Sequence, residues 1–500
     1  MTQQITSSIV TVTGGLILDQ DVYSMPPGAA SILNNFEPSI LGGYRRLSGT
    51  SKYSSSQVNG SNTVQGVFVY NDQVFAISNG TLARSAGSSW TNLETGLNAS
   101  GRYMGERFNY ENTEKLILVN GADNPRVISG NTVSTITASG VPTDAQHVAS
   151  FRSHMFYAGM SSNPQEIVFS SPFNEDDFQA SNGAGSIKVD DNITGLKVFR
   201  DNLFIFCQDR IFKLTGSGLA SFAIENISRH IGCLDGFSIQ EIGGDLTFLG
   251  PDGIRTVQGT ARIGDIELGS ISKPIQRRFE DIILDRISSV VIREKSQYRL
   301  FTPSTNGIEK AAKGIIGVIK ATPQGGIGWE WADLKGIKPS CCDSYYISNN
   351  EVVVHGGYDG YVYQQESGNT FAGTNIRASY RSPDLTLGDA GIRKNMQRIN
   401  VNYDSEGEVD LMLGVKFDFE NSDIPQPANY NLTTQVSHAL YGGTGVTYGS
   451  AAYGSEGFPI VRQPIEGSGF TAVVKIDDTS SNPPITLKGF QLEFTPGTRM

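Results

Sequence analysis

The sequence predicts an all-β fold: a β-propeller of about six or seven blades, a C-terminal β-sandwich domain and one short helix. Three observations predict it. Short apolar strands alternate with Asn, Asp and Gly turns, a repeat of several strands recurs along the middle of the chain, and 57 of the 500 residues are glycine. Runs of Val, Ile, Phe and Tyr that are interrupted by such turns are signals of β-hairpins.

The repeat is clearest between residues 196 and 214. An apolar strand reaches a polar turn at 200–202, a second strand follows at 203–206, and another turn leads to a third strand at 211–214. First turns of this kind lie near positions 71, 111, 152, 200, 243, 295 and 349, about 40 to 54 residues apart. That period, with several strands per unit, is typical of a propeller, in which neighbouring units bury each other's apolar faces. A β-sandwich, whose strands also follow one another at intervals of about ten residues, is the alternative.

Three regions are expected along the chain: an N-terminal arm and assembly segment at 1–62, the β-propeller at 63–366 and the C-terminal β-sandwich domain at 367–500. In the first region, Ile9 and Val10 predict a strand that closes the propeller ring or pairs with a neighbour.

The last region alternates polar and apolar residues strictly, which predicts strands with one buried face. We expect one hairpin from residues 397–403 and 409–415, and a second pair from 470–476 and 485–494. The one short helix is expected at about 272–285, because serine suits the N-cap position and proline suits the first turn of a helix.

Several side chains are expected in the core. Phe204 and Ile205 point to opposite faces of one strand, and a stacked blade buries both faces. Trp329 and Trp331 alternate like strand residues and are expected in the core rather than as a ligand platform. The cysteines form no disulfide framework and are expected as reduced, mostly buried thiols: Cys207, Cys233, Cys341 and Cys342.

The composition argues against two classes of protein. Only 18% of the residues are charged and the net charge is −11, with no basic stripe of the kind that grips nucleic-acid phosphates. No apolar run approaches the length of a transmembrane helix, so we expect no membrane insertion. The N-terminal residues also lack the basic and apolar segments of a signal peptide.

We expect no catalytic site, cofactor or metal. The chain has no phosphate-binding loop and no nucleophile elbow, and its five histidines have no spacing to carboxylates or cysteines that would suggest zinc. One alternative is a glycosidase, which needs paired carboxylates, and Glu175, Asp176 and Asp177 are the candidate cluster. Ser88-Ser89-Trp90-Thr91 is faintly similar to part of a sialidase repeat, but the Asp and Gly at fixed offsets do not recur.

The residues before the repeats carry a pattern of their own. Pro27-Gly28-Ala29 is followed by Leu33-Asn34-Asn35 and then by Gly42-Gly43-Tyr44-Arg45-Arg46-Leu47-Ser48-Gly49. Such an opening, followed by propeller-like repeats and a closing β domain, resembles tail nozzle or hub proteins of short-tailed bacteriophages. The larger nozzle proteins carry extra inserted domains, for which this chain has no room.

The resemblance implies a structural virion protein without enzymatic activity. It implies a ring, commonly of six copies, that extends the DNA conduit below the portal and adaptor, contacts tail fibre or spike proteins, and takes part in DNA retention and ejection. DNA would pass without sequence-specific binding. The protein would be located in the virion tail and assembled in the cytoplasm of the bacterial host. The alternatives are a carbohydrate-binding or glycoside-hydrolysing propeller for host-surface recognition, and a propeller scaffold for contacts with host proteins.

Two groups of residues are candidates for the subunit interface. Tyr44, Arg45 and Arg46 follow two glycines, where the chain can turn sharply, and arginine forms bidentate bonds with carboxylates of a neighbour. If the two arginines are exposed, replacing both by Glu should leave the fold intact; the alternative is a solvated surface pair. The second group lies in a Gly/Tyr loop, which either contacts a neighbouring subunit or packs on itself: Tyr441, Tyr448 and Tyr453.

Overall fold

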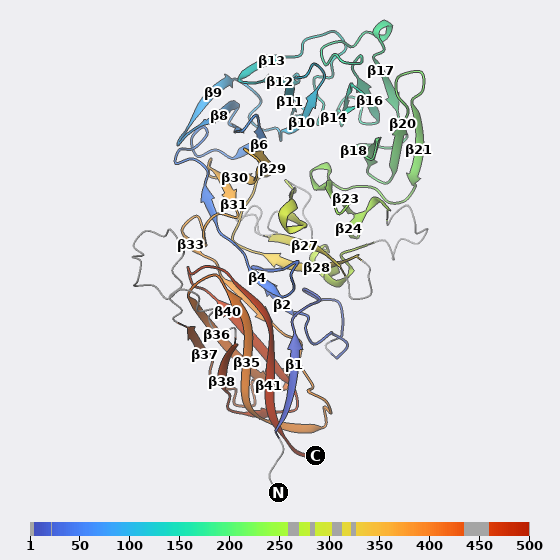
Figure 1. Ribbon diagram of the computed structural model, residues 1–500. Coiled ribbons are helices and arrows are strands. Elements are labelled where there is room, and N and C mark those ends of the chain that lie inside the picture. Colours follow the sequence, from blue (N-terminus) through green and yellow to red (C-terminus); the bar gives the residue numbers. More distant parts are fainter. Residues whose placement is uncertain are drawn as a thin grey trace. The chain divides into compact units, whose positions relative to one another are not determined.

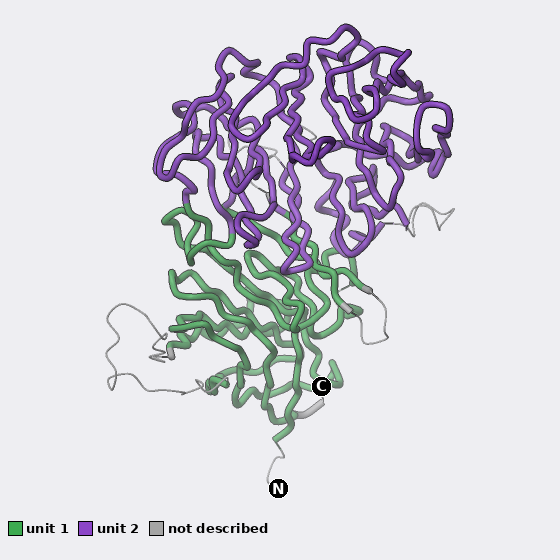
Figure 2. The backbone as a smooth tube through the Cα atoms, turned by 45° about the horizontal axis from the view of Figure 1, so that its top comes forward, with its two compact units in different colours: residues 1–51, 315–336, 366–500 green, residues 52–314, 337–365 purple. Residues whose placement is uncertain are grey.

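The protein is almost wholly β in the computed structural model, which describes residues 5–21, 23–258, 270–280, 286–302, 313–321, 327–434 and 460–499 (Figure 1). The chain divides into two compact units, coloured separately in Figure 2. Unit 2 comprises residues 52–314 and 337–365, and unit 1 comprises residues 1–51, 315–336 and 366–500.

Unit 2 is a β-propeller in which six small sheets form a ring (Figure 1). The first two sheets contain β6 (Val64–Tyr70), β7 (Gln73–Ser78), β8 (Thr81–Ala86) and β9 (Ser89–Thr95), then β10 (Met104–Asn109), β11 (Glu114–Val119), β12 (Arg126–Ser129) and β13 (Thr132–Thr135). The next two contain β14 (His147–Phe151), β15 (His154–Ala158), β16 (Glu166–Phe169) and β17 (Gly185–Lys188), then β18 (Ile193–Phe199), β19 (Asn202–Cys207), β20 (Ile211–Thr215) and β21 (Ala223–Ser228). The last two contain β22 (Gln240–Ile242), β23 (Asp245–Gly250) and β24 (Gly253–Thr256), then β29 (Cys341–Ile347), β30 (Asn350–Gly356) and β31 (Val362–Gln365).

One further hairpin lies between the fifth and sixth sheets. It consists of β25 (Ser288–Ile292) and β26 (Gln297–Thr302), and β25 contacts both β22 and β29. The ring therefore has a seventh inner strand beside its six sheets. This confirms the predicted propeller of about six or seven blades, because each recurring turn in the sequence corresponds to one inner hairpin.

The tight turns explain why the repeat was visible in the sequence. At the turns near 71, 152, 200 and 349, the two central residues have positive φ, as a two-residue hairpin turn requires. Asn71 and Asp72, for example, have φ values of 49° and 54° between β6 and β7. Short polar side chains tolerate this conformation better than most residues do.

Both faces of the blade strands are buried, as predicted. Ile205 packs in the apolar cluster shared with the preceding blade, whereas Phe204 and Phe206 pack in the cluster shared with the following one. Alternate side chains of β19 therefore hold neighbouring blades together. Cys207, Cys233 and Cys341 are buried free thiols, and Cys342 is half-buried.

The predicted helix at 272–285 is replaced by a shorter element. Only Lys273–Arg278 is helical, in 3-10 geometry, and residues 281–285 lie outside the described residues. Ile275 has non-helical angles, and the Ser272 hydroxyl accepts a hydrogen bond from Ile254 N rather than capping the helix. The other short 3-10 helices described are η1 (Ala180–Asn182), η2 (Gly236–Ser238), η5 (Arg293–Lys295) and η6 (Asp418–Glu420).

Unit 1 is a β-sandwich of two sheets. We call the first sheet the one that contains β1 (Thr6–Thr11), β3 (Phe36–Pro38), β4 (Tyr44–Arg46), β35 (Ile392–Ser405), β38 (Ile460–Pro464), β39 (Ser468–Gly469) and β41 (Ile485–Arg499). The second sheet contains, in spatial order, β27 (Lys313–Ala321), β28 (Ile327–Leu334), β2 (Ile32–Asn34), β34 (Ala378–Arg381), β40 (Ala472–Asp478), β36 (Val409–Phe417) and β37 (Tyr430–Thr434). Three short strands complete the description: β5 (Thr50–Lys52), β32 (Thr370–Phe371) and β33 (Thr374–Asn375).

The four strands that the sequence predicts in the sandwich are present as parts of β35, β36, β40 and β41, but their predicted pairing is wrong. β35 pairs with β41 in the first sheet, whereas β36 pairs with β40 in the second sheet. The connections at 406–408 and 479–484 therefore cross from one sheet to the other, and neither predicted pair is a hairpin. Alternation marks which face of a strand is buried, but it does not distinguish a hairpin from a crossing between two sheets.

The N-terminal residues belong to the sandwich. β1 pairs with β41 of the same unit. It therefore does not close the propeller ring, which was one of the two roles predicted for this strand. β28 also belongs to unit 1, and its Trp331 is buried and stacks on Trp329 with ring centroids 5.4 Å apart. The expected boundaries at 62 and 366 thus differ from the compact units, because three separate segments of the chain build one sandwich.

Replacing Ile205 or Phe204 by Asp should each destabilise the protein by several kcal/mol, because each change buries an unpaired carboxylate between two blades. Ile224→Asp on β21 is the matched control, since Ile224 is exposed on the outer strand of the same sheet. Denaturant unfolding measures the difference. Parent-like unfolding of both core variants would contradict this blade assignment.

Candidate functional site

The strand Tyr44–Arg46, a predicted interface, lies inside the sandwich rather than on its surface. β4 is flanked by β3 and β41, and its side chains alternate in direction. Tyr44 and Arg46 point inward with no exposed surface, whereas Arg45 points outward. The expectation of two exposed arginines is therefore wrong for Arg46.

Tyr44 connects its own strand to the residues that precede it, through hydrogen bonds to Gly15 and Gly28. Its hydroxyl accepts a hydrogen bond from Gly15 N and donates one to Gly28 O, each at 3.0 Å. Its ring lies 5.7 Å from that of Tyr380 in the second sheet, and burial raises its pKa well above the usual value. Gly43 has φ of 84°, and a Cβ there would lie 2.3 Å from Leu487 O. The glycine is thus required by its close approach to β41.

Arg46 connects the two sheets. Its Nη1 forms an ion pair with Asp478 Oδ2 of β40 at 3.0 Å and donates to Ser480 O at 3.2 Å. Its Nη2 donates to the carbonyls of Asn369 and Asn482, at 3.0 and 2.8 Å. The guanidinium therefore fixes the crossing between β40 and β41 from the inside of the sandwich.

Arg45 uses its charge within the chain. Its Nε and Nη2 donate to the two carboxylate oxygens of Glu406 at 2.8 and 3.1 Å, and its Nη1 lies 3.4 Å from Glu37 Oε1. This is the bidentate geometry that was predicted for a contact with another subunit, but the partner is in the same chain. The other predicted interface residues, Tyr441, Tyr448 and Tyr453, lie outside the described residues.

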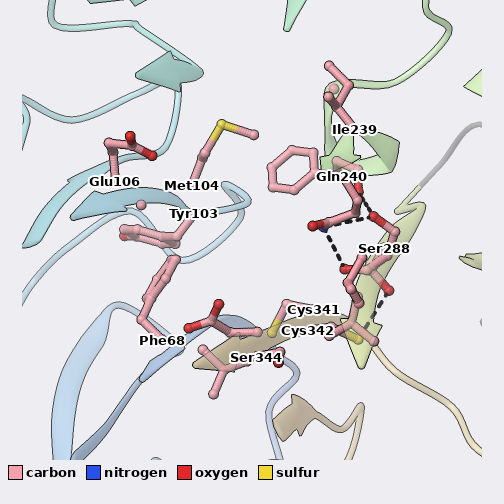
Figure 3. A pocket seen from close by; sticks show the side chains of 18 of the residues that line it. Phe68, Tyr103, Met104, Glu106, Ile239, Gln240, Ser288, Cys341, Cys342 and Ser344 are labelled. Carbon is pink, nitrogen blue, oxygen red and sulfur yellow. Dashed lines mark hydrogen bonds between the residues drawn. The ribbon is translucent and has the colours of Figure 1, made fainter. Parts of the chain in front are cut away.

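The centre of the propeller holds a cavity of about 200 Å³, lined by residues of all seven inner strands (Figure 3). Glu106, on β10, faces this space, and burial raises the pKa of its carboxyl, while Lys197 and Arg107 oppose that rise. Arg107 forms an ion pair with Asp343 and donates to Val69 O. Charges of both signs therefore line the cavity.

The thiols of this cavity are poor nucleophiles. Burial raises the pKa of Cys341 to about 11 and that of Cys342 further, so both remain protonated near neutral pH. No group of His, Cys, Asp and Glu residues suited to a metal ion occurs among the described residues.

A second cavity, of about 410 Å³, lies where the inner strands β10, β14 and β18 begin. Arg102 pairs there with Asp235 at 3.3 Å and stacks over the ring of Phe237, with the guanidinium carbon 3.6 Å from the ring centroid. The buried His147 lies beside them, and its Nδ1 has no hydrogen-bond partner. Burial, together with the charge of Arg102, lowers the pKa of His147 to about 4.

The carboxylates proposed for a glycosidase are engaged in local contacts. Glu175 accepts from Lys115 Nζ at 2.7 Å, and Asp177 accepts from Gln179 N and Asn182 Nδ2. The cluster therefore organises a turn and does not present two opposed carboxylates across a cleft, as glycoside hydrolysis needs.

Comparisons with known proteins provide little beyond the fold. No family model and no curated protein matches the sequence. Among solved structures, the chain is similar to Raptor of Chaetomium thermophilum (TM-score 0.41, 10% identity, 65% of this chain and 29% of that one). It is also similar to BamB of Moraxella catarrhalis (TM-score 0.36, 12% identity, 72% of this chain and 97% of that one). An ancestral GH74 enzyme is similar as well (TM-score 0.38, 10% identity, 68% of this chain and 50% of that one). Likenesses this low carry no argument about function. No helix among the described residues is long and apolar enough to cross a membrane.

Arg46→Ala should destabilise the protein by about 3–5 kcal/mol, because it leaves Asp478 as a buried carboxylate without its cation. Glu406→Ala is the control and should cost about 1 kcal/mol or less, because its ion pair with Arg45 is partly exposed and Arg45 keeps Glu37 as a partner. Denaturant unfolding of the two variants measures the difference. Equal effects would show that Arg46 does not hold the sheets together.

The part of the stability that His147 and His355 contribute should fall when the pH is lowered from about 6.5 towards 4. His147 and His355 have folded pKa values of about 4 and about 3, below their usual 6.5, so in this range the unfolded chain binds protons that the folded chain does not. Each histidine contributes a slope of up to about 1.4 kcal/mol per pH unit. His147→Asn should reduce the slope, measured by denaturant unfolding between pH 4.5 and 7, and an unchanged slope would contradict the assignment. His230→Asn, at an exposed histidine, is the control.

Proposed function

We propose that this protein is a structural subunit of the tail nozzle or hub ring of a short-tailed bacteriophage. The opening pattern, the propeller and the closing β domain are the features that resemble such proteins. In this proposal the ring, of about six copies, extends the DNA conduit below the portal and adaptor and contacts tail fibre or spike proteins. The net charge of −11 on each chain repels DNA and so disfavours adhesion during passage.

The observation that carries the proposal is the placement of exposed apolar side chains. Nine of the thirteen large apolar side chains exposed among the described residues lie in unit 1, although it is the smaller unit. Two of them, Ile9 and Ile460, lie on strands at the edges of a sheet, where a second chain can pair. A propeller has few free sheet edges, so the sandwich is the part of the chain suited to subunit contacts.

The purified chain should form a ring of about six copies, and it should join tails when virion components are added. Light scattering combined with electron microscopy measures the first property, and incorporation into tails measures the second. A chain that remains monomeric and never enters a tail would overturn the proposed function. Glycan binding, with loss of a hydrolytic activity in Glu175→Gln, would instead support the carbohydrate-processing alternative.

A further inference from the structure

The first sheet of unit 1 has two edges that lie in register across four strands. Its central rows run from β1 to β41, from β41 to β35 and from β35 to β38. One row, for example, joins Val10, Phe490, Val401 and Val461. Among the described residues, neither β1 nor β38 pairs with a further strand.

The directions of these edges are complementary. All three pairings are antiparallel, so β1 and β38 run in opposite directions at the two sides of the sheet. If a second copy brings its β38 beside β1 of the first copy in the same orientation, the new pair is again antiparallel. The alternation of strand direction then continues across the boundary between subunits. Each copy uses one edge, β1, towards one neighbour and a different edge, β38, towards the other, as a ring with head-to-tail contacts requires.

The β1 edge has none of the usual protection against strand pairing. Its sequence, Thr-Ser-Ser-Ile-Val-Thr, contains no charge and no proline, and its pairing with β41 has no bulge. Natural proteins normally protect a free sheet edge with charged side chains, prolines or β-bulges. Ile9 is 75% exposed on this strand, and Ile460 is 46% exposed on β38. Among the described residues, both edges therefore lack a strand partner and carry an exposed β-branched apolar side chain, although β38 also contains Arg462 and Pro464.

A second apolar feature lies along the same edge as β1. The turn between β3 and β4 presents Leu41, which is 90% exposed, and Lys488 Nζ donates to Gly42 O at 3.2 Å. Val12 N, just after β1, donates to the carbonyl of the same Lys488. The turn and the end of β1 thus meet at one residue of β41, and Leu41 extends the apolar surface of this edge.

We propose that β1 of one copy pairs with β38 of a second copy, so that subunits join head-to-tail by strand addition through unit 1. This inference rests on the proposed ring and names the surface that forms it. The interface therefore lies at the sheet edges and the Leu41 turn, rather than at Arg45 and Arg46.

The test uses Ile9→Lys and Ile460→Lys, which place a charge at one edge each. Both side chains are exposed, so at concentrations too low for assembly the melting temperatures should match that of the parent. Ile224→Lys is the matched control, because Ile224 is an exposed isoleucine on the outer strand β21 of a propeller blade. Sedimentation velocity over a concentration series measures the assembly of each variant.

Each edge variant alone should assemble at least about tenfold more weakly than the parent, whereas Ile224→Lys should assemble normally. A 1:1 mixture of the two edge variants should form dimers and nothing larger, because Ile9→Lys keeps an intact β38 and Ile460→Lys keeps an intact β1. Hydrogen exchange on the parent provides a readout independent of substitution: the amides of both edge strands should become protected on assembly.

Three results would overturn the inference. Normal assembly of both edge variants would exclude the two edges, and normal assembly of Ile460→Lys alone would exclude β38 as the partner of β1. Unprotected edge amides in the assembled parent would exclude strand addition even if a variant failed to fold. Head-to-tail assemblies that never enter tails would instead contradict only the proposed function, and a parent that stays monomeric would contradict both.

Discussion

The sandwich depends on one buried cation. Arg46, on a strand contributed by the first fifty residues, reaches Asp478 on the opposite sheet and three carbonyls around the crossing between β40 and β41. The charge of this fully buried guanidinium is paired and both Nη atoms donate hydrogen bonds, whereas Nε has no hydrogen-bond partner among the described residues. Because the ion pair joins Arg46 to Asp478, 432 positions along the chain, the N-terminal and C-terminal segments must fold as one domain. The propeller is inserted between them in the chain, with β27 and β28 returning to the sandwich midway.

The propeller could be predicted because its information is local. Each hairpin turn needs residues that accept positive φ, so Asn-Asp or Arg-Asp pairs mark the repeat directly. The pairing of the sandwich could not be predicted in the same way. β35 and β36 follow each other closely and alternate in the same manner, yet they belong to different sheets because each has a distant partner. The fifteen-residue strand β41 pairs with β1 and β4, which lie more than 400 residues earlier in the sequence, and with β35, whose paired residues lie 80 to 107 positions earlier.

The candidate interface was predicted less well, for a physical reason. The sequence drew attention to two adjacent arginines, and arginine is usually exposed. Strand alternation, however, turns Tyr44 and Arg46 inward and leaves Arg45 outside, where Glu406 already satisfies its charge. The period-2 rule applied to this three-residue strand would have predicted opposite directions for the two arginines. No local signal indicated that the buried partner would be Asp478, or that Ile9 would lie on a free edge.

Because β41 comes long after β1 and β4 in the sequence, the pairing of the first sheet also sets an order of events during synthesis. Both β1 and β4 pair with β41, so neither can complete its sheet until residues 485–499 have left the ribosome. The blades encoded by residues 52–258 have their main partners nearby and can form earlier. Nascent chains therefore lack a finished first sheet until β41 has been synthesised, because β41 lies between β35 on one side and β1 and β4 on the other.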